Sequence, residues 1–403
     1  MGDGQISGKG FRRRVFYIPG YDPFHPRRYR ELYRKEGADQ ARISGYQIDL
    51  KPKSGKGPYG WHVSSQIDGQ AAEADVEVLV WSDIVKSSMD LGIARTYLQL
   101  VRTAWAYIGS GALFRLMRLR KGPMIAALYP IIFLIAQLCL ALLAGWGLGA
   151  LVAHVSHWSL GLAAGAGLVW AMLRAFRRWD SKVFAYYLMH DYAYSAQARG
   201  ANPPELEARM AEFRAAIAEA LAGDVDEVLV VGHSSGAHLA VSILSDLIRA
   251  GLPARRPALA FLSLGQVVPM VSFLPEARRL RADLAYLSAR EELTWIDVTA
   301  PGDGCAFALC DPVAVTGVAP EGKRWPLVLT AAFTQTLSPE RWAELRWRFF
   351  RLHFQYLCAF DRPGHYDYFQ ITAGPIPLAD RYAGRPAAKS RIETALSGYR
   401  TVA

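Results

Sequence analysis

Apolar and polar positions follow two rhythms along this chain, and an uninterrupted apolar tract separates its two halves. Short β-branched or alternating runs predict strands, whereas apolar residues three and four positions apart predict helices. The expected strands are Val15–Ile18, Arg42–Leu50, Trp61–Ile67, Val76–Trp81, Val228–Val231, Ala258–Leu264, Leu293–Val298 and Pro326–Ala332. The expected helices are Pro26–Gly37, Asp180–Arg199, Pro204–Leu221, Ala237–Ala250 and Pro275–Ser288. Strands that alternate with helices predict an α/β fold, with a mostly parallel sheet flanked by helices.

The apolar tract contains no Asp, Glu, Lys or Arg between residues 122 and 173. Because a membrane span needs about 20 apolar residues, the tract predicts a two-helix transmembrane hairpin. Two histidines and a tryptophan favour Ala153–Ser159 as the turn, with spans at Leu128–Val152 and Leu160–Phe176. The alternative turn is Gly145–Gly147, and the alternative interpretation of the whole tract is a buried hairpin in a soluble core.

Basic residues flank the tract on both sides. They are Arg115, Arg118, Arg120 and Lys121 before it, and Arg174, Arg177, Arg178 and Lys182 after it. Because cytoplasmic loops are rich in Lys and Arg, both ends of the hairpin are expected in the cytoplasm and its turn in the periplasm or a lumen. Arg12–Arg14 is not followed by an apolar stretch, so no cleaved signal is expected. The Ala/Arg-rich composition favours a bacterial inner membrane.

The tract reads as an insertion into one α/β domain. Residues 1–87 form the N-terminal part of that domain, and residues 179–403 form the C-terminal part. Residues 122–178 are the hairpin. In residues 88–121, apolar positions at helical spacing are interrupted by arginines, which predicts a basic amphipathic segment on the membrane surface. An ordinary surface helix packed on the sheet is the alternative.

The charge and the cysteine content indicate which partners and which bound groups to expect. The formal net charge is +10, but the basic residues cluster around the apolar tract, so anionic lipid head groups are a better match than nucleic acid. Of four cysteines, Cys139 lies in the first span and the others lack C-x-x-C spacing. We therefore expect no disulfide framework and no zinc site. No cofactor-binding motif is present, and we expect neither a cofactor nor a metal.

A Gly-x-Ser-x-Gly motif, Gly232 to Gly236, joins a predicted strand to a predicted helix. In that context the strand directs the turn, and the two glycines allow the backbone and helix to approach closely. Ser234 is then held on a strained corner with its hydroxyl exposed. The N–H of Ser235 lies at a helix N-terminus, where it can stabilise an oxyanion. The motif predicts that Ser234 is a nucleophile.

A serine nucleophile of this kind needs a histidine base and an acid that orients it, both later in the chain. Asp303 lies in a loop after the strand that ends at Val298 and is the preferred acid, with Asp297 and Asp311 as alternatives. His353, in an apolar helical run, and His365, in a loop, compete as the base.

The first predicted strand ends in Pro19-Gly20-Tyr21. Gly20 permits close approach, so the N–H of Tyr21 can act as a second oxyanion donor. This loop, the Gly-x-Ser-x-Gly turn, and an Asp and a His that follow in that order together resemble the α/β-hydrolase superfamily. The resemblance covers most of the chain outside the membrane insertion, and the turn is its specific motif. It implies the following site: Ser234 as nucleophile, Asp303 as acid, His353 or His365 as base, and the amides of Tyr21 and Ser235 as oxyanion hole.

These features predict a membrane-integrated serine hydrolase, lipase- or esterase-like, that cleaves a lipid or other acyl ester through an acyl-enzyme intermediate. A thioesterase or amidase could use the same residues. The expected partners are the lipid bilayer and an acyl-ester or lipid substrate. The alternative is a catalytically inactive hydrolase fold that acts as a membrane scaffold or interaction protein. Two spans without an intramembrane charge argue against a transporter.

Overall fold

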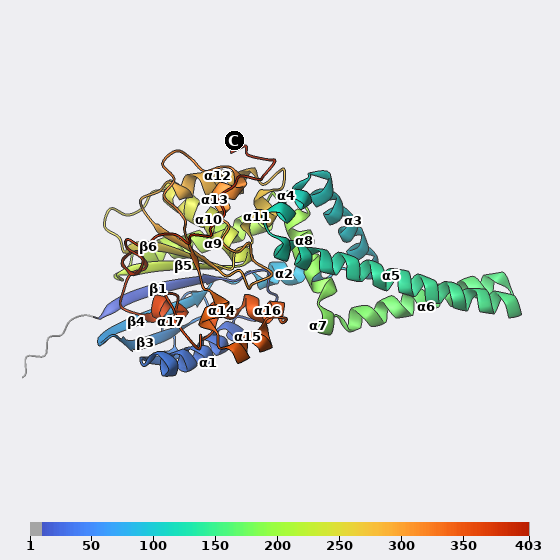
Figure 1. Cartoon of the computed structure of the whole chain (residues 1–403), viewed down its shortest axis with the longest axis horizontal. Helices are drawn as coiled ribbons and strands as arrows, with labels where there is room; N and C mark the ends of the chain where they lie inside the picture. The colour runs from blue at the N-terminus through green and yellow to red at the C-terminus, as the bar shows by residue number, and fades with distance from the viewer. Residues whose placement is uncertain (1–9, 403) are drawn as a thin grey trace, which may run out of the picture.

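A computed structural model describes residues 10–402, in which an α/β domain carries a long projecting helical hairpin (Figure 1). The described strands are β1 (Phe11–Ile18), β2 (Gln47–Pro52), β3 (Gly60–Ile67), β4 (Gln70–Val78), β5 (Glu227–His233), β6 (Ala258–Leu264), β7 (Thr294–Thr299) and β8 (Leu327–Thr330). They form one sheet in the order β2-β3-β4-β1-β5-β6-β7-β8. The six strands from β4 to β8 in that order are parallel, while β3 pairs antiparallel with both β4 and the edge strand β2. The predicted α/β class and mostly parallel sheet are confirmed.

Helices make up most of the remaining ordered structure. Before the second half of the sheet come α1 (Arg27–Ser44), α2 (Ser82–Met89), α3 (Ile93–Gly109), α4 (Ala112–Leu119), α5 (Lys121–Val155), α6 (Trp158–Arg178), α7 (Asp180–Val183), α8 (Ala185–Ala196) and α9 (Pro204–Leu221). After β5 come α10 (Ser235–Arg249), α11 (Val268–Ser272), α12 (Arg278–Ser288), α13 (Pro312–Thr316), α14 (Phe333–Thr336), α15 (Pro339–Leu345), α16 (Phe349–His353), the 3-10 turn η1 (Gln355–Leu357), α17 (Tyr368–Ala373) and α18 (Leu378–Arg381).

Helices cover both faces of the sheet. Figure 1 shows α9, α10 and α12 on one side, and α1 with α14 to α17 on the other. Two separate apolar cores result, one on each face of the strands. Every residue of β5 is buried as a consequence, as expected for a central parallel strand. Because β1 pairs with both β4 and β5, the chain segments before and after the hairpin belong to one sheet.

Several element boundaries differ from the sequence-based expectation. The strand expected at Val76–Trp81 is Gln70–Val78, the helix expected at Asp180–Arg199 is divided into α7 and α8, and the helix expected from Pro275 begins at Arg278. The first helix continues past Gly37 to Ser44, so the strand expected from Arg42 begins instead at Gln47. Gly37 does not end the helix because it lies against the ring of Phe369, where a larger side chain would not fit freely. The helix ends at Gly45, whose φ of 75° suits glycine.

The hairpin consists of α5 and α6, which meet at Ser156 and His157. The predicted turn at residues 153–159 is confirmed, and the alternative at residues 145–147 is wrong. The two helices pack through small residues: a Cβ atom on Gly165 would lie 2.6 Å from the carbonyl oxygen of Gly145, and one on Gly149 would lie 3.0 Å from that of Gly161. Small residues at these positions let the two helix backbones approach closely. Membrane helices commonly associate in this way, because the hydrophobic effect does not drive helices together in lipid.

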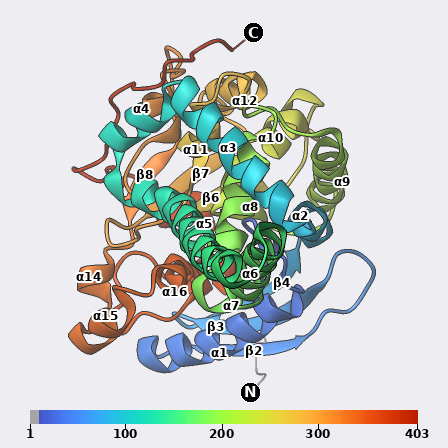
Figure 2. The same cartoon turned by 90° about the vertical axis from the view of Figure 1, so that its right-hand side faces the viewer.

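Both hairpin helices are long and apolar enough to cross a membrane, and only 28% and 17% of their most apolar windows are buried. The hairpin is therefore not a core element of the α/β domain. Its first half packs on neighbouring elements: Met124 and Ala127 join one apolar cluster, and Leu134 joins another with residues of α3 and α8. Figure 2, which looks along the hairpin, shows α3 and α8 near the base of the hairpin, and α8 contacts α5.

The predicted amphipathic segment forms α3 and α4. Leu100 and Tyr107 are on the buried face of α3. Large apolar side chains are exposed elsewhere on the two helices: Leu98, Val101, Trp105, Ile108, Phe114 and Met117. The amphipathic membrane-surface segment, and contact of this exposed apolar surface with a membrane, stay predictions.

Candidate active site

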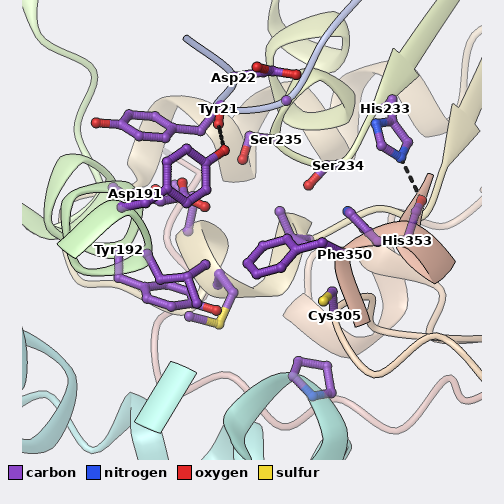
Figure 3. Close-up of a pocket in the computed structure, with 18 of the residues that line it drawn as sticks. Tyr21, Asp22, Asp191, Tyr192, His233, Ser234, Ser235, Cys305, Phe350 and His353 are labelled. Carbon is purple, nitrogen blue, oxygen red and sulfur yellow. Dashed lines mark hydrogen bonds between the residues drawn. The ribbon is translucent and has the colours of Figure 1, made fainter. Parts of the chain in front are cut away.

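The candidate site lies at the carboxyl ends of neighbouring parallel strands, where open α/β sheets bind ligands. The parallel register pairs Ile18 at the end of β1 with Gly232 near the end of β5. The loop after β1 therefore lies beside the turn that carries Ser234. Figure 3 shows this part of the molecule.

Ser234 is held in a strained backbone conformation between β5 and α10. Its φ is 56° and its ψ is −121°, values that are rare for a residue with a side chain. Its N–H donates to the carbonyl of Leu264, 2.9 Å away, which ties the turn to β6. Its side chain is partly exposed and lines a cavity. Strand, turn and helix are thus in the arrangement that presents a serine hydroxyl to substrate.

The glycines around Ser234 are required by close packing. A Cβ atom on Gly232 would lie 2.8 Å from the Cα atom of Ala237, and one on Gly236 would collide with the carbonyl oxygen of Ile18. One on Gly20 would lie 2.9 Å from the Cβ atom of Ser234. The motif and the loop after β1 are therefore sterically interlocked.

Asp303 and His353, separated by fifty residues, form a buried hydrogen-bonded pair. The Nδ1–H of His353 donates to Oδ2 of Asp303 over 2.7 Å. The hydroxyl of Tyr356 donates to the same oxygen, and the N–H of Cys305 donates to Oδ1. Burial raises the pKa of Asp303, but the charge of His353 and these hydrogen bonds outweigh it and hold the pKa below its usual range. Asp303 is thus ionised and orients the imidazole.

The other nitrogen of His353, Nε2, has no hydrogen-bond partner among residues 10–402, and neither does the hydroxyl of Ser234. Both side chains line the same cavity. A Cβ atom on Gly265, which follows Leu264, would lie 3.2 Å from Cε1 of His353, so the imidazole edge is at the end of β6. Leu264 also binds the N–H of Ser234, which places His353 next to the serine turn.

The competing candidates lie elsewhere. His365 is exposed and lines a different cavity, with Asp367 and Arg381. Asp297 accepts a hydrogen bond from Ser263 within the sheet. Asp311 caps α13 and pairs with Lys323. None of these three groups lines the cavity that contains Ser234.

Tyr21 and Ser235 also line this cavity. Within the described chain, neither backbone N–H donates a hydrogen bond to another residue. The Tyr21 side chain is fixed by hydrogen bonding to Ser88, and its carbonyl accepts from the hydroxyl of Tyr187. The loop is therefore anchored while its N–H groups stay available for an oxyanion.

The cavity has a volume of about 80 Å³. Its apolar wall includes Val267, Met270 and Phe350, and Pro123 from the base of α5 reaches it as well. A Cβ atom on Gly122 would lie 3.3 Å from the carbonyl oxygen of Gly304, so the hairpin base packs on the loop that carries Asp303. Hairpin and candidate site are in direct contact.

Three residues at the site were not found from sequence. Tyr356 supports Asp303, as described above. The Nε2–H of His233 donates to the backbone carbonyl of His353 over 2.9 Å, and burial, reinforced by His353, lowers the pKa of His233 to about 3. Asp191, on α8, lines the cavity from the helical insertion. His233 lies inside the Gly-x-Ser-x-Gly motif, but the motif does not specify that position, and no local motif marks Tyr356 or Asp191.

Asp303, Cys305 and His353 offer ligand atoms within 4.8 Å of one another, a spacing that could hold a metal ion. Two of these three residues, Asp303 and His353, are already joined by a hydrogen bond. Burial, with Asp303 and Asp191 nearby, raises the pKa of Cys305 and favours its neutral thiol over the thiolate that binds metals. The arrangement fits an acid–histidine pair better than a metal centre.

Comparisons with known proteins do not assign this chain to a family. The chain matches no protein-family model, and neither the curated proteins nor the solved structures contain a match. The class defined by fold and site is an α/β protein with a strained serine turn beside a buried Asp–His pair.

Proposed function

We propose that this protein is a membrane-integrated serine hydrolase of the α/β-hydrolase type, which cleaves a lipid or other acyl ester through an acyl-enzyme intermediate. One observation carries the proposal. Ser234, on its strained turn, shares a cavity with His353, whose Nδ1–H is held by Asp303. This combination leaves Nε2 free to take a proton from a serine hydroxyl.

In the proposed reaction, Oγ of Ser234 attacks the ester carbonyl carbon and its proton passes to Nε2 of His353. Asp303 stabilises the resulting imidazolium. The N–H groups of Tyr21 and Ser235 receive the negative charge on the carbonyl oxygen. The leaving alcohol takes the proton from Nε2 as the carbon–oxygen bond breaks. Water then attacks the acyl-serine in the reverse sequence, releasing the acid and restoring the Ser234 hydroxyl.

The proposal places this site at a membrane surface. Pro123 lines the cavity and the predicted first span starts at Leu128, about 8 Å further along the helix at 1.5 Å per residue. Basic residues flank both ends of the hairpin, which supports a cytoplasmic catalytic domain, at the bacterial inner membrane. An apolar substrate could then reach Ser234 from the bilayer without crossing water.

The size of the cavity bears on the substrate. About 80 Å³ is well below the roughly 300–1,000 Å³ of typical ligand pockets. A compact acyl group fits without rearrangement, whereas a long acyl chain requires neighbouring side chains to move. Phe350 bounds the cavity on the side of the insertion, where its ring packs against Phe184 and Tyr187.

The decisive experiment is labelling of the full-length protein, in detergent-solubilised membranes, with a fluorophosphonate probe that reacts with activated serines. Wild type should be labelled, and Ser234→Ala should not be. Ser159→Ala is a matched control, because the Ser159 hydroxyl is also 2.8 Å from a histidine nitrogen but lies on the exposed hairpin turn. It should retain full labelling.

The base is tested in the same assay. His353→Ala should abolish labelling, and His365→Ala should leave it unchanged, because His365 lies outside the cavity. If folded wild type is not labelled, the hydrolase proposal fails and the inactive scaffold becomes the better explanation.

A further inference from the structure

One charged group in the cavity has no role in the proposed reaction. Asp191 projects from α8, and in Figure 3 it lies on the opposite side of Ser234 from His353. Its carboxylate has no hydrogen bond and no ion pair with any residue between 10 and 402. It also lines the adjoining cavity, with His238 and Asn202. Polar groups that water reaches poorly are normally paired in proteins, so a partly buried carboxyl group that lines a cavity without a protein partner suggests a ligand.

The residues around Asp191 indicate that such a ligand carries a positive charge. Although the chain carries a net charge of +10, neither cavity is lined by a Lys or Arg. The other acid on the wall, Asp22, already accepts from the hydroxyl of Tyr29 and the N–H of Phe24. Burial raises the pKa of Asp191 to about 7, and the only nearby charge that lowers it is that of His353. Among the residues that line the two cavities, no Lys or Arg stabilises the ionised form of Asp191, and the charge of His353 is what favours it.

Aromatic rings surround the same space. Tyr21, Tyr187 and Tyr192 line the cavity with Asp191, and Trp81 and Tyr194 line the adjoining one. Tyr21 is in ring contact with Tyr187, Tyr194 and Trp81 at centroid distances of 5.7–6.2 Å. Aromatic rings next to an acidic group are the chemistry that binds alkylammonium ions, through cation–π and charge attraction.

We propose that Asp191 and these rings form a subsite for a compact alkylammonium group on the substrate. The inference rests on the proposed hydrolase function and narrows it to esters that carry a cationic group. An ammonium group would stabilise the ionised form of Asp191 by charge attraction, which a neutral hydroxyl cannot do. The small cavity suits such a head group better than a long chain.

The test compares two esters of the same shape, acetylcholine and 3,3-dimethylbutyl acetate, which differ in the positive charge. With the full-length protein in detergent, wild type should show about tenfold higher kcat/KM for the cationic ester, mostly through KM. Asp191→Asn, which is nearly isosteric, should reduce this ratio to about one. Asp22→Asn is the matched control and should keep the ratio, because Asp22 already has partners.

A binding measurement keeps the inference testable apart from turnover. Tetramethylammonium chloride should slow fluorophosphonate labelling of wild type, relative to sodium chloride at equal ionic strength, and should not slow labelling of Asp191→Asn. Equal kcat/KM for both esters, a preference that survives Asp191→Asn, or labelling that ignores tetramethylammonium would overturn the subsite alone. Absence of labelling would overturn the hydrolase proposal itself, so the two failures are distinguishable.

Discussion

Helices α10 and α6 are both apolar, but the protein covers only one of them. All residues of α10 except Asp246 and Arg249 are buried, because the sheet and neighbouring helices enclose it. In α6 only Gly161, Gly165 and Leu173 are buried. Apolar surface is stabilised by removal from water, whatever removes it. For α10 the protein does so, whereas for α6 the surrounding medium must, and this contrast is the physical basis for proposing a membrane.

The contrast extends to glycine. In α10, Gly236 lets the helix touch the carbonyl of Ile18 and so fixes the position of Ser234. In the hairpin, Gly145 and Gly165 let two helices touch each other and leave their outer faces free. The same residue thus shapes the turn of Ser234 in one region and the packing of two apolar helices in the other.

The largest expected effect is at the acid that orients His353. Asp303→Asn should lower kcat by about 10⁴-fold, because an amide at this position holds the imidazole in the wrong tautomer. Steady-state ester hydrolysis measures this. Asp311→Asn, after the same strand but outside the cavity, should change kcat by only a few-fold, and an equal loss in both variants would contradict the assigned roles.

The next effect tests the two uses of glycine. Gly236→Ala should destabilise the domain by more than about 3 kcal/mol, because its Cβ atom would collide with the Ile18 carbonyl and the core cannot yield. Gly167→Ala is the control, since nothing lies within 4 Å of a Cβ atom there. Thermal unfolding in detergent compares them. Similar melting temperatures for the two variants would show that the turn is not tightly interlocked.

A charged residue introduced on the hairpin tests whether a lipid bilayer surrounds it. Leu143 is 64% exposed near the middle of α5. Leu143→Arg should cost about 3 kcal/mol of membrane insertion, whereas Leu143→Ala should cost much less. The fraction resistant to alkaline extraction from membranes reports insertion. If the arginine variant is inserted as well as wild type, the hairpin does not span a bilayer at this position.

The smallest effect concerns the pH dependence of stability. We expect it to arise from buried carboxyl groups of the α/β domain and not from the hairpin. Burial raises the pKa of Asp297 to about 8, so the folded state holds its proton more tightly than the unfolded state. Its contribution to stability therefore falls as pH rises from about 4 to about 8. Asp303, with a lowered pKa, contributes the opposite slope at acid pH. Asp297→Asn should raise the melting temperature at pH 8 by about 2–4 °C and at pH 5 by less. An equal shift at both pH values would contradict this account.

Much of the fold was predictable because its signals are local. The runs that form β5 and β6 and the apolar tract that forms α5 and α6 are contiguous in sequence. Boundaries failed where packing overrode local preference, as at Gly37, which a neighbouring aromatic ring retains within α1. The site was predictable to the same extent: the serine turn is a local motif, but the choice between His353 and His365 is not.

By itself, the sequence determined the α/β class, the Gly-x-Ser-x-Gly turn and the position of the hairpin turn, because periodicity and turn chemistry act over a few residues. Only the tertiary structure decided that His353 pairs with Asp303, that Tyr356 and His233 support the pair, and that Asp191 enters the same cavity without a partner. Those relations join residues tens to more than a hundred positions apart. They depend on which strand ends and helices meet, and no short stretch of sequence carries that information.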